Sequence, residues 1–177
     1  MPSPHLVDAI DRLDPVPYRG EAYRHLAPRW HPLSGGGARI QGGRWNPPES
    51  FATLYLALEK PTAAAEFRRM AAQICRSPED FVPRRLYRYR LELHAVLDLT
   101  GKRDQLPQAL AELDLQGSDR SATQVVGEAA EHLGREAIKA PSATGTGEVI
   151  AVFIDRLLPD SAIEPLDFET WELPPSY

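Results

Sequence analysis

The feature that most constrains the fold of this chain is a strict alternation of residue types between Tyr87 and Leu99. The apolar members of the alternation are Tyr87, Tyr89, Leu91, Leu93, Ala95, Leu97 and Leu99. Most of the residues between them are polar or charged. Successive side chains of a β-strand point to opposite faces, so this pattern predicts one long strand with a single buried face.

The other patterns predict a mixture of helices and strands. Apolar residues at helical spacing predict a helix over residues 5–13 and another that opens near Pro61. Short β-prone runs predict further strands at 21–26, 51–58, 137–140 and 149–154. These elements do not alternate as in a doubly wound parallel sheet. We therefore expect an α+β fold with mixed or antiparallel sheets flanked by helices.

The helix near Pro61 has an apolar stripe that predicts a buried face, formed by Phe67, Met70, Ala71 and Ile74. Glu66 lies at the edge of this stripe, and Cys75 follows it, which favours core packing of the thiol over a role as nucleophile. A short helix is expected over residues 105–113. Ser121 and Gln124 form an S-x-x-Q capping box, which predicts that a further helix begins there.

Composition excludes several classes of protein. The chain has 177 residues, of which 42% are hydrophobic and 25% charged, with a net charge of −5. We expect one domain over 1–177, with a core over about 20–158 and a C-terminal tail over 159–177, of which residues 165–177 form a loosely held edge segment. No apolar run is long enough for a membrane span, and the acidic balance argues against direct nucleic-acid binding.

The single cysteine excludes an intrachain disulfide, and the first residues have no pattern of a secretory signal, so we expect a cytoplasmic protein. The five histidines are not paired at metal-ligand spacing, and we therefore expect no metal site.

The segment from Leu33 to Pro48 is the clearest indication of a binding site. Five of its sixteen residues are glycine, and it also contains two arginines, a tryptophan and an asparagine. Glycine lets the backbone approach a ligand closely, whereas arginine and asparagine supply fixed hydrogen-bond donors. A flexible linker would lack such side chains. The segment predicts the wall of a pocket for a planar, charged, phosphate-bearing molecule.

Candidate binding residues lie in and around this segment. Arg24 and Arg44 could grip a phosphate with paired donors, although Arg24 also fits a surface ion pair. Trp45 and Tyr55 could stack on a ring, and Asn46 could donate to an amide. The alternative is structural: Trp45 fills the core, Asn46 caps a bend, and Tyr55 packs inside.

Two further candidates would act on the bond that breaks. Glu66 fits either a solvated carboxylate or a group beside a ribose whose glycosidic bond is cleaved, because cleavage builds positive charge on the sugar. Ser121 fits a helix cap, and a cap at the edge of a cleft can also donate to a ligand.

Together these motifs resemble the RES-domain toxins of bacterial toxin–antitoxin pairs. The matches run in order over about residues 20–155, and the block Gly42-Gly43-Arg44-Trp45-Asn46 is the most specific of them. The other matches are Tyr23-Arg24, Ser34-Gly35-x-Gly37-Ala38, Tyr55-Leu56-Ala57, Glu66, Val96-Leu97-Asp98-Leu99, Ser121 with Gln124, Val126-Gly127-x-Ala129-Ala130 and Ala140-Pro141-Ser142. His25 stands where many relatives have a tyrosine.

The resemblance implies a fold similar to ADP-ribosyltransferase toxins, with NAD bound as substrate in a central cleft. It implies catalytic roles for Arg24, Glu66 and Ser121, the residue types that name the family. The residues expected to bind NAD are Arg24, Arg44, Trp45, Asn46, Tyr55, Glu66 and Ser121.

The implied reaction breaks the nicotinamide–ribose bond, with inorganic phosphate or water as acceptor and no metal. The alternatives are a mono-ADP-ribosyltransferase that modifies a host protein and a non-catalytic NAD-binding subunit. The resemblance also implies an oligomer with an Xre-like helix-turn-helix antitoxin that blocks the cleft.

Overall fold

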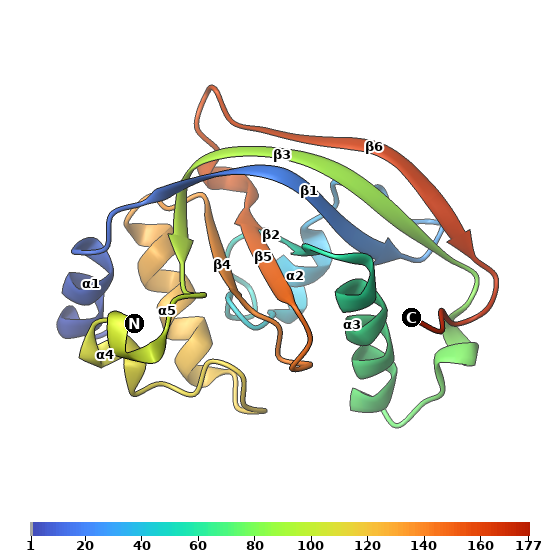
Figure 1. The fold of residues 1–177 in the computed structure, drawn as a ribbon, viewed down its shortest axis with the longest axis horizontal. Helices are drawn as coiled ribbons and strands as arrows, with labels where there is room; N and C mark the ends of the chain where they lie inside the picture. Colours follow the sequence, from blue (N-terminus) through green and yellow to red (C-terminus); the bar gives the residue numbers. More distant parts are fainter. Residues whose placement is uncertain (1) are drawn as a thin grey trace.

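Residues 2–177 are described by a computed structural model, in which six strands form one bent sheet (Figure 1). The strand order is β1–β2–β5–β4–β3–β6, and β1 (Val16–Leu26) also pairs with β3 (Arg84–Asp98). The first five strands therefore close into a ring, and β6 (Ala162–Trp171) extends the sheet beside β3. The remaining strands are β2 (Thr53–Ala57), β4 (Ala137–Pro141) and β5 (Glu148–Phe153).

Helices cover two separate parts of this sheet. The first group is α1 (Pro4–Asp11), α4 (Gln108–Ala111) and α5 (Ser121–His132), which gather at one end of the molecule (Figure 1). At the other end α3 (Lys60–Gln73) packs against β1 and β2, and α2 (Gly36–Gln41) contacts β2. Short 3-10 helices are η1 (Pro78–Phe81), η2 (Arg103–Gln105) and η3 (Ile154–Arg156). The expected α+β class is confirmed, and the sheet is mixed, since β3 and β4 are parallel.

The long strand predicted from the alternation is present as β3. Tyr87, Tyr89, Leu91 and Leu93 are buried on one face, in the core between β1, β2 and β5. Beyond His94 the alternation fails, because Val96 and Leu97 are both fully buried while Ala95 is half-buried. There β3 has left β6, its pairing with β1 ends at Val96, and pairing with β4 begins. Val96 and Leu97 pack in two different core clusters, so both faces of the strand are covered.

The buried carboxylate of Glu136 holds β3 where it changes partner. One oxygen, Oε2, accepts hydrogen bonds from the backbone N–H groups of His94 and Ala95, at 2.6 and 2.7 Å. The other, Oε1, accepts from the N–H of Leu158 at 2.9 Å. These bonds satisfy backbone donors that the sheet ladder leaves unpaired at this point.

The apolar stripe predicted on α3 is confirmed only in part. Phe67 and Ala71 are fully buried and Met70 is half-buried, but Ile74 is 57% exposed. The helix ends at Gln73, and Cys75 has a positive φ of 54°, so helical spacing no longer applies to either residue. The expectation that Cys75 packs in the core is wrong, because the thiol is exposed.

Other expected elements are shorter, longer or more ordered than predicted. Of the helix expected over 105–113, only α4 forms, after the single turn η2. The C-terminal tail is not loosely held, since β6 pairs along β3 and Trp171 is buried against α3. The glycine-rich segment is also not a plain loop, because α2 occupies its middle. Within residues 2–177, none of the helices combines the length and apolarity required to cross a bilayer.

Candidate functional site

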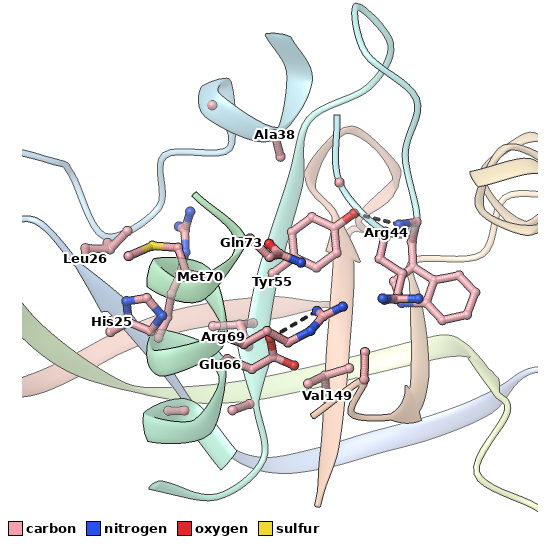
Figure 2. A pocket seen from close by; sticks show the side chains of 18 of the residues that line it. His25, Leu26, Ala38, Arg44, Tyr55, Glu66, Arg69, Met70, Gln73 and Val149 are labelled. Carbon is pink, nitrogen blue, oxygen red and sulfur yellow. Dashed lines mark hydrogen bonds and ion pairs between the residues drawn. The ribbon is translucent and has the colours of Figure 1, made fainter. Parts of the chain in front are cut away.

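A cavity of about 430 Å³ lies where α3 faces β1, β2 and the glycine-rich segment. Its lining comes from these elements and from single residues of β3, β5, the segment before α5 and the turn between β4 and β5. Figure 2 shows Glu66 and Arg69 of α3 at the centre of this lining, with His25 on one side and Tyr55 and Arg44 on the other.

The charged side chains of the lining are strongly unbalanced. Five arginines line the cavity, at positions 24, 44, 69, 84 and 120, and Glu66 is the only carboxylate among the lining residues. The whole chain has a net charge of −5, so this cationic lining is a local feature and does not follow from composition. Such a pocket attracts anions, and arginine in particular suits phosphate groups.

Arg24 projects from β1 and is held by backbone carbonyls. Its Nη1 donates to the carbonyl oxygens of Pro32 and Ser34, at 3.2 and 3.0 Å. Burial lowers the pKa of Arg24, although an arginine keeps its charge in such a site. The guanidinium therefore fixes the start of the glycine-rich segment and brings its positive charge to the cavity wall.

Arg44 ties the glycine-rich segment to the segment before α5. Its two terminal nitrogens donate to the carbonyl oxygens of Leu115 and Gly117, at 3.2 and 3.0 Å. Burial lowers the pKa of Arg44, and the nearby charges of Arg69 and Arg120 lower it further. These three guanidinium groups therefore lie within electrostatic reach of one another.

Tyr55, Asn46 and Trp45 form a structural unit behind the cavity. The Tyr55 hydroxyl donates to Oδ1 of Asn46 at 2.7 Å and accepts from the N–H of Trp45 at 2.8 Å. The Asn46 amide donates to the carbonyl of Ala38 at 2.7 Å. Tyr55 and Trp45 line the cavity, whereas Asn46 is fully buried outside its lining. Burial raises the pKa of Tyr55 well above its usual range, so the hydroxyl stays protonated.

Glu66 reaches the cavity from α3, and a hydrogen bond from the turn between β4 and β5 holds its carboxylate. Its Oε1 accepts a hydrogen bond from Oγ of Ser142 at 2.7 Å. Its Oε2 lies 3.9 Å from Nη1 of Arg69, the ion pair marked in Figure 2. Ser142 is fully buried in the turn between β4 and β5, and the N–H of Thr144 donates to its oxygen. The carboxylate is thus oriented by a rigid hydroxyl and keeps a charged neighbour.

Ser121 does not take the position that the capping box predicts. The N-cap of α5 is Arg120, and the Ser121 hydroxyl donates instead to Oδ2 of Asp119 at 2.9 Å. The predicted box partner Gln124 donates to the carbonyl of Gly43 at 3.0 Å, so it joins α5 to the glycine-rich segment. The capping-box prediction is therefore wrong. Ser121 is exposed and outside the lining, which its neighbour Arg120 reaches.

His25 positions another side chain of the cavity wall. Burial lowers the pKa of His25 to about 3, and the charges of Arg84 and Arg24 contribute, so the ring is neutral. Its Nδ1 accepts a hydrogen bond from Nε of Arg84 at 3.0 Å, and its ring packs against those of Phe67 and Trp171. His25 therefore orients Arg84 at the cavity wall.

Sequence reasoning missed four residues of this site: Arg69, Arg84, Arg120 and Ser142. Only Arg69 had a local signal, because it follows Glu66 by three positions on a helix and so shares its face. Arg84 and Arg120 lie far from Glu66 in the chain, and Ser142 lies in the second glycine turn, whose contact with α3 is purely tertiary.

The fold and the cavity together define the class: an α+β protein with an arginine-lined pocket for an anionic ligand. The chain belongs to the RES-domain family, whose family model matches residues 17–174. The proposed resemblance is thereby confirmed.

Relatives with known names agree with this assignment. The chain is 34% identical over 156 residues to the NAD(+) phosphorylase MbcT of Mycobacterium bovis. This match covers 87% of this chain and 84% of that protein. The same identity and coverage hold for MbcT of Mycobacterium tuberculosis. The crystal structure of the M. tuberculosis MbcT–MbcA toxin–antitoxin complex matches with a TM-score of 0.82 and 28% identity, over 95% of this chain and 92% of that one.

Proposed function

We propose that this chain is a toxin that degrades NAD by breaking the bond between nicotinamide and ribose, with inorganic phosphate as acceptor. One observation carries the proposal: a single oriented carboxylate, Glu66, lies in a cavity otherwise lined by five arginines. A dinucleotide supplies the anions that such a lining attracts, and a glycosidic bond is the kind of bond that a fixed carboxylate helps to cleave.

The chemistry assigns a role to each group. Loss of neutral nicotinamide leaves positive charge on the ribose, and Glu66 stabilises that charge where it develops. Arg24 and Arg44 neutralise phosphate groups. Tyr55 forms the wall beside a ring, and Trp45, which is fully buried in the core, supports that wall. Ser121 remains a proposed catalytic residue by its match to the family, and Asn46 acts by holding Tyr55 and the loop.

The relatives support further parts of the proposal. MbcT bears the name of an NAD(+) phosphorylase and forms a complex with an antitoxin, MbcA, and we propose a corresponding antitoxin for this chain. We propose that this antitoxin is of the Xre-like helix-turn-helix type and blocks the cavity. For the chain itself, the same proposal includes an ADP-ribosyltransferase-like fold, a single domain and a cytoplasmic location. Among residues 2–177 no group of three or more histidines, cysteines and acids could hold a metal, and the proposed reaction uses none.

The direct test resolves the products of NAD turnover by mass, with and without inorganic phosphate. Nicotinamide together with a phosphorylated ADP-ribose supports phosphorolysis, and nicotinamide with plain ADP-ribose indicates that water is the acceptor. Labelled NAD added to a cell lysate tests the transferase alternative, which requires a labelled protein. Absence of nicotinamide under all these conditions would show that the proposed function is wrong.

The substitution Glu66→Gln should lower kcat for nicotinamide release by about 100-fold or more, because it removes the charge opposite the developing cation. The measurement is the rate of nicotinamide release at saturating NAD, with the melting temperature as a check of folding. Glu79→Gln, an exposed carboxylate in η1 outside the cavity lining, is the matched control and should leave the rate unchanged.

A further inference from the structure

The cations of the cavity fall into two groups at opposite sides of it. Arg84 donates a hydrogen bond to the ring of His25, and Arg24 precedes His25 in β1. The charges of both arginines add to the effect of burial in lowering the pKa of His25. Arg44, Arg69 and Arg120 form the second group: Arg44 bonds to the segment that leads to Arg120, and Arg120 contacts α3 one turn after Arg69. The charges of Arg69 and Arg120 also lower the pKa of Arg44. In Figure 2, His25 and Arg44 lie on opposite sides, with Glu66 and Arg69 between them. The cavity therefore offers two cationic regions, each suited to an anion.

Glu66 belongs with the second group, which we call the acceptor cluster (Arg44, Arg69 and Arg120). Arg69 lies 3.9 Å from the Glu66 carboxylate, and Glu66 is also a charged neighbour of Arg44. Arg120, the residue directly before α5, lines the cavity. Its Nη2 donates a hydrogen bond to the neutral amide oxygen of Gln73 at 3.2 Å.

The positive charge of the acceptor cluster is only partly balanced by carboxylates around it. Arg44 binds two backbone carbonyls and Arg120 binds an amide, so within residues 2–177 the only carboxylate bound by a member of the cluster is Glu66, through Arg69. Three guanidinium groups brought together around one carboxylate repel one another, and a bound anion relieves that repulsion. The cluster is therefore suited to a small dianion that enters separately from the dinucleotide.

We propose that the acceptor cluster binds the inorganic phosphate that attacks the ribose, while Arg24 and Arg84 hold the diphosphate of NAD. This inference rests on the proposed function and assigns the two anions of its reaction to separate sites. It makes Arg120 the residue that selects phosphate over water as acceptor.

The reaction balances with the groups present. The bond between the ribose carbon and the nicotinamide nitrogen breaks, and nicotinamide leaves as a neutral molecule with the bonding electron pair. A phosphate oxygen forms the new bond to the same carbon, which gives nicotinamide and ADP-ribose 1″-phosphate. The attacking oxygen must come close to the carbon that Glu66 stabilises, and the acceptor cluster is the cationic region beside Glu66.

The test is Arg120→Gln, which removes the charge but keeps an amide donor. We expect the KM for phosphate to rise about tenfold or more, because a charge-assisted contact to the phosphate is lost. The KM for NAD should stay within about twofold of its original value, since the dinucleotide phosphates lie at the other region. The product ratio should shift from ADP-ribose 1″-phosphate toward ADP-ribose, and Arg120→Lys should restore part of the phosphorolysis.

Two controls keep this inference separate from the proposed function. Arg76→Gln removes an exposed arginine that pairs with Asp80 outside the cavity lining, and it should change neither KM. Inorganic phosphate alone should raise the melting temperature of the original chain more than sodium chloride of equal ionic strength, and this gain should be lost in Arg120→Gln.

Equal rises of both KM values in Arg120→Gln, or an unchanged product ratio, would overturn the assignment of the acceptor cluster. A chain that binds phosphate through Arg120 but releases no nicotinamide would instead retain the anion site and refute the proposed function.

Discussion

At the scale of single residues, the most informative contact is the hydrogen bond from Ser142 to Glu66. A carboxylate on a helix surface has several rotamers, and a buried hydroxyl at 2.7 Å selects one of them. The turn that carries Ser142 is itself fixed, because its serine and threonine side chains bond to one another and to backbone N–H groups. Ser142 is thus a positioning residue for the carboxylate.

Ser142→Ala should lower kcat for nicotinamide release about tenfold, because an unrestrained carboxylate spends less time opposite the ribose. The KM for NAD should change less than about threefold, since Ser142 lies outside the cavity lining. Steady-state kinetics of both parameters are the measurement. Thr146→Ala in the same turn, at an exposed position, is the control. A rise of KM with kcat unchanged would show that Ser142 acts on binding and not on Glu66.

At the scale of elements, the site depends on how closely α5 approaches the glycine-rich segment. A Cβ on Gly127 would overlap the backbone carbonyl of Trp45, so no other residue type fits there without movement. Gln124, one turn earlier, donates to the carbonyl of Gly43. On the other side of the segment, Gly42 has a φ of 72° and lets the chain turn between α2 and Arg44. The helix therefore positions Arg44 through its neighbours.

Gly127→Ala should destabilise the fold by about 1–3 kcal/mol, because the added methyl group has no space against the backbone of Trp45. It should also reduce kcat/KM for NAD, since the segment that bears Arg44 must shift. Chemical denaturation and kinetics measure the two effects. Glu128→Ala, at the next and half-exposed position of α5, should change the stability much less. Equal stability of the two variants would mean that α5 moves away from the segment at little cost.

At the scale of the whole molecule, one buried carboxylate holds the sheet where β3 passes from β1 and β6 to β4. Burial acts to raise the pKa of Glu136, but hydrogen bonds to the charged form outweigh burial, and the pKa is lowered from its usual value. A lowered pKa in the folded state means that the stabilisation is complete above the unfolded pKa. The stabilisation is lost as the pH falls through the folded pKa.

Glu136→Gln should lower the free energy of unfolding at pH 7 by about 2–3 kcal/mol, since the amide replaces one acceptor by a donor facing buried N–H groups. The difference from the original chain should shrink as the pH falls below the ordinary pKa of glutamate and through the lowered pKa of Glu136, because the native carboxylate then takes up a proton. Denaturation at a series of pH values measures this. Glu164→Gln, which breaks an exposed ion pair with Arg90, should have little effect. A constant difference at all pH values would contradict the role of the charge.

The sequence by itself determined the elements with strong local periodicity and the chemical character of the site. The alternation from Tyr87 predicted most of β3, and the glycine-rich segment with Arg44 predicted a cavity wall, because these signals lie in neighbouring residues. The domain limits and catalytic roles inferred for Arg24, Glu66 and Ser121 remain predictions.

Only the tertiary structure decided which distant side chains meet. Ser142 contacts Glu66 across 76 positions, and Arg84 bonds to His25 across 59, so no local pattern could reveal either pair. The capping role predicted for Ser121 and the burial predicted for Ile74 were wrong for a related reason, because the end of a helix depends on its surroundings. The closure of the sheet through β1 and β3 brings these segments together, and closure is a property of long-range pairing that local propensity does not contain.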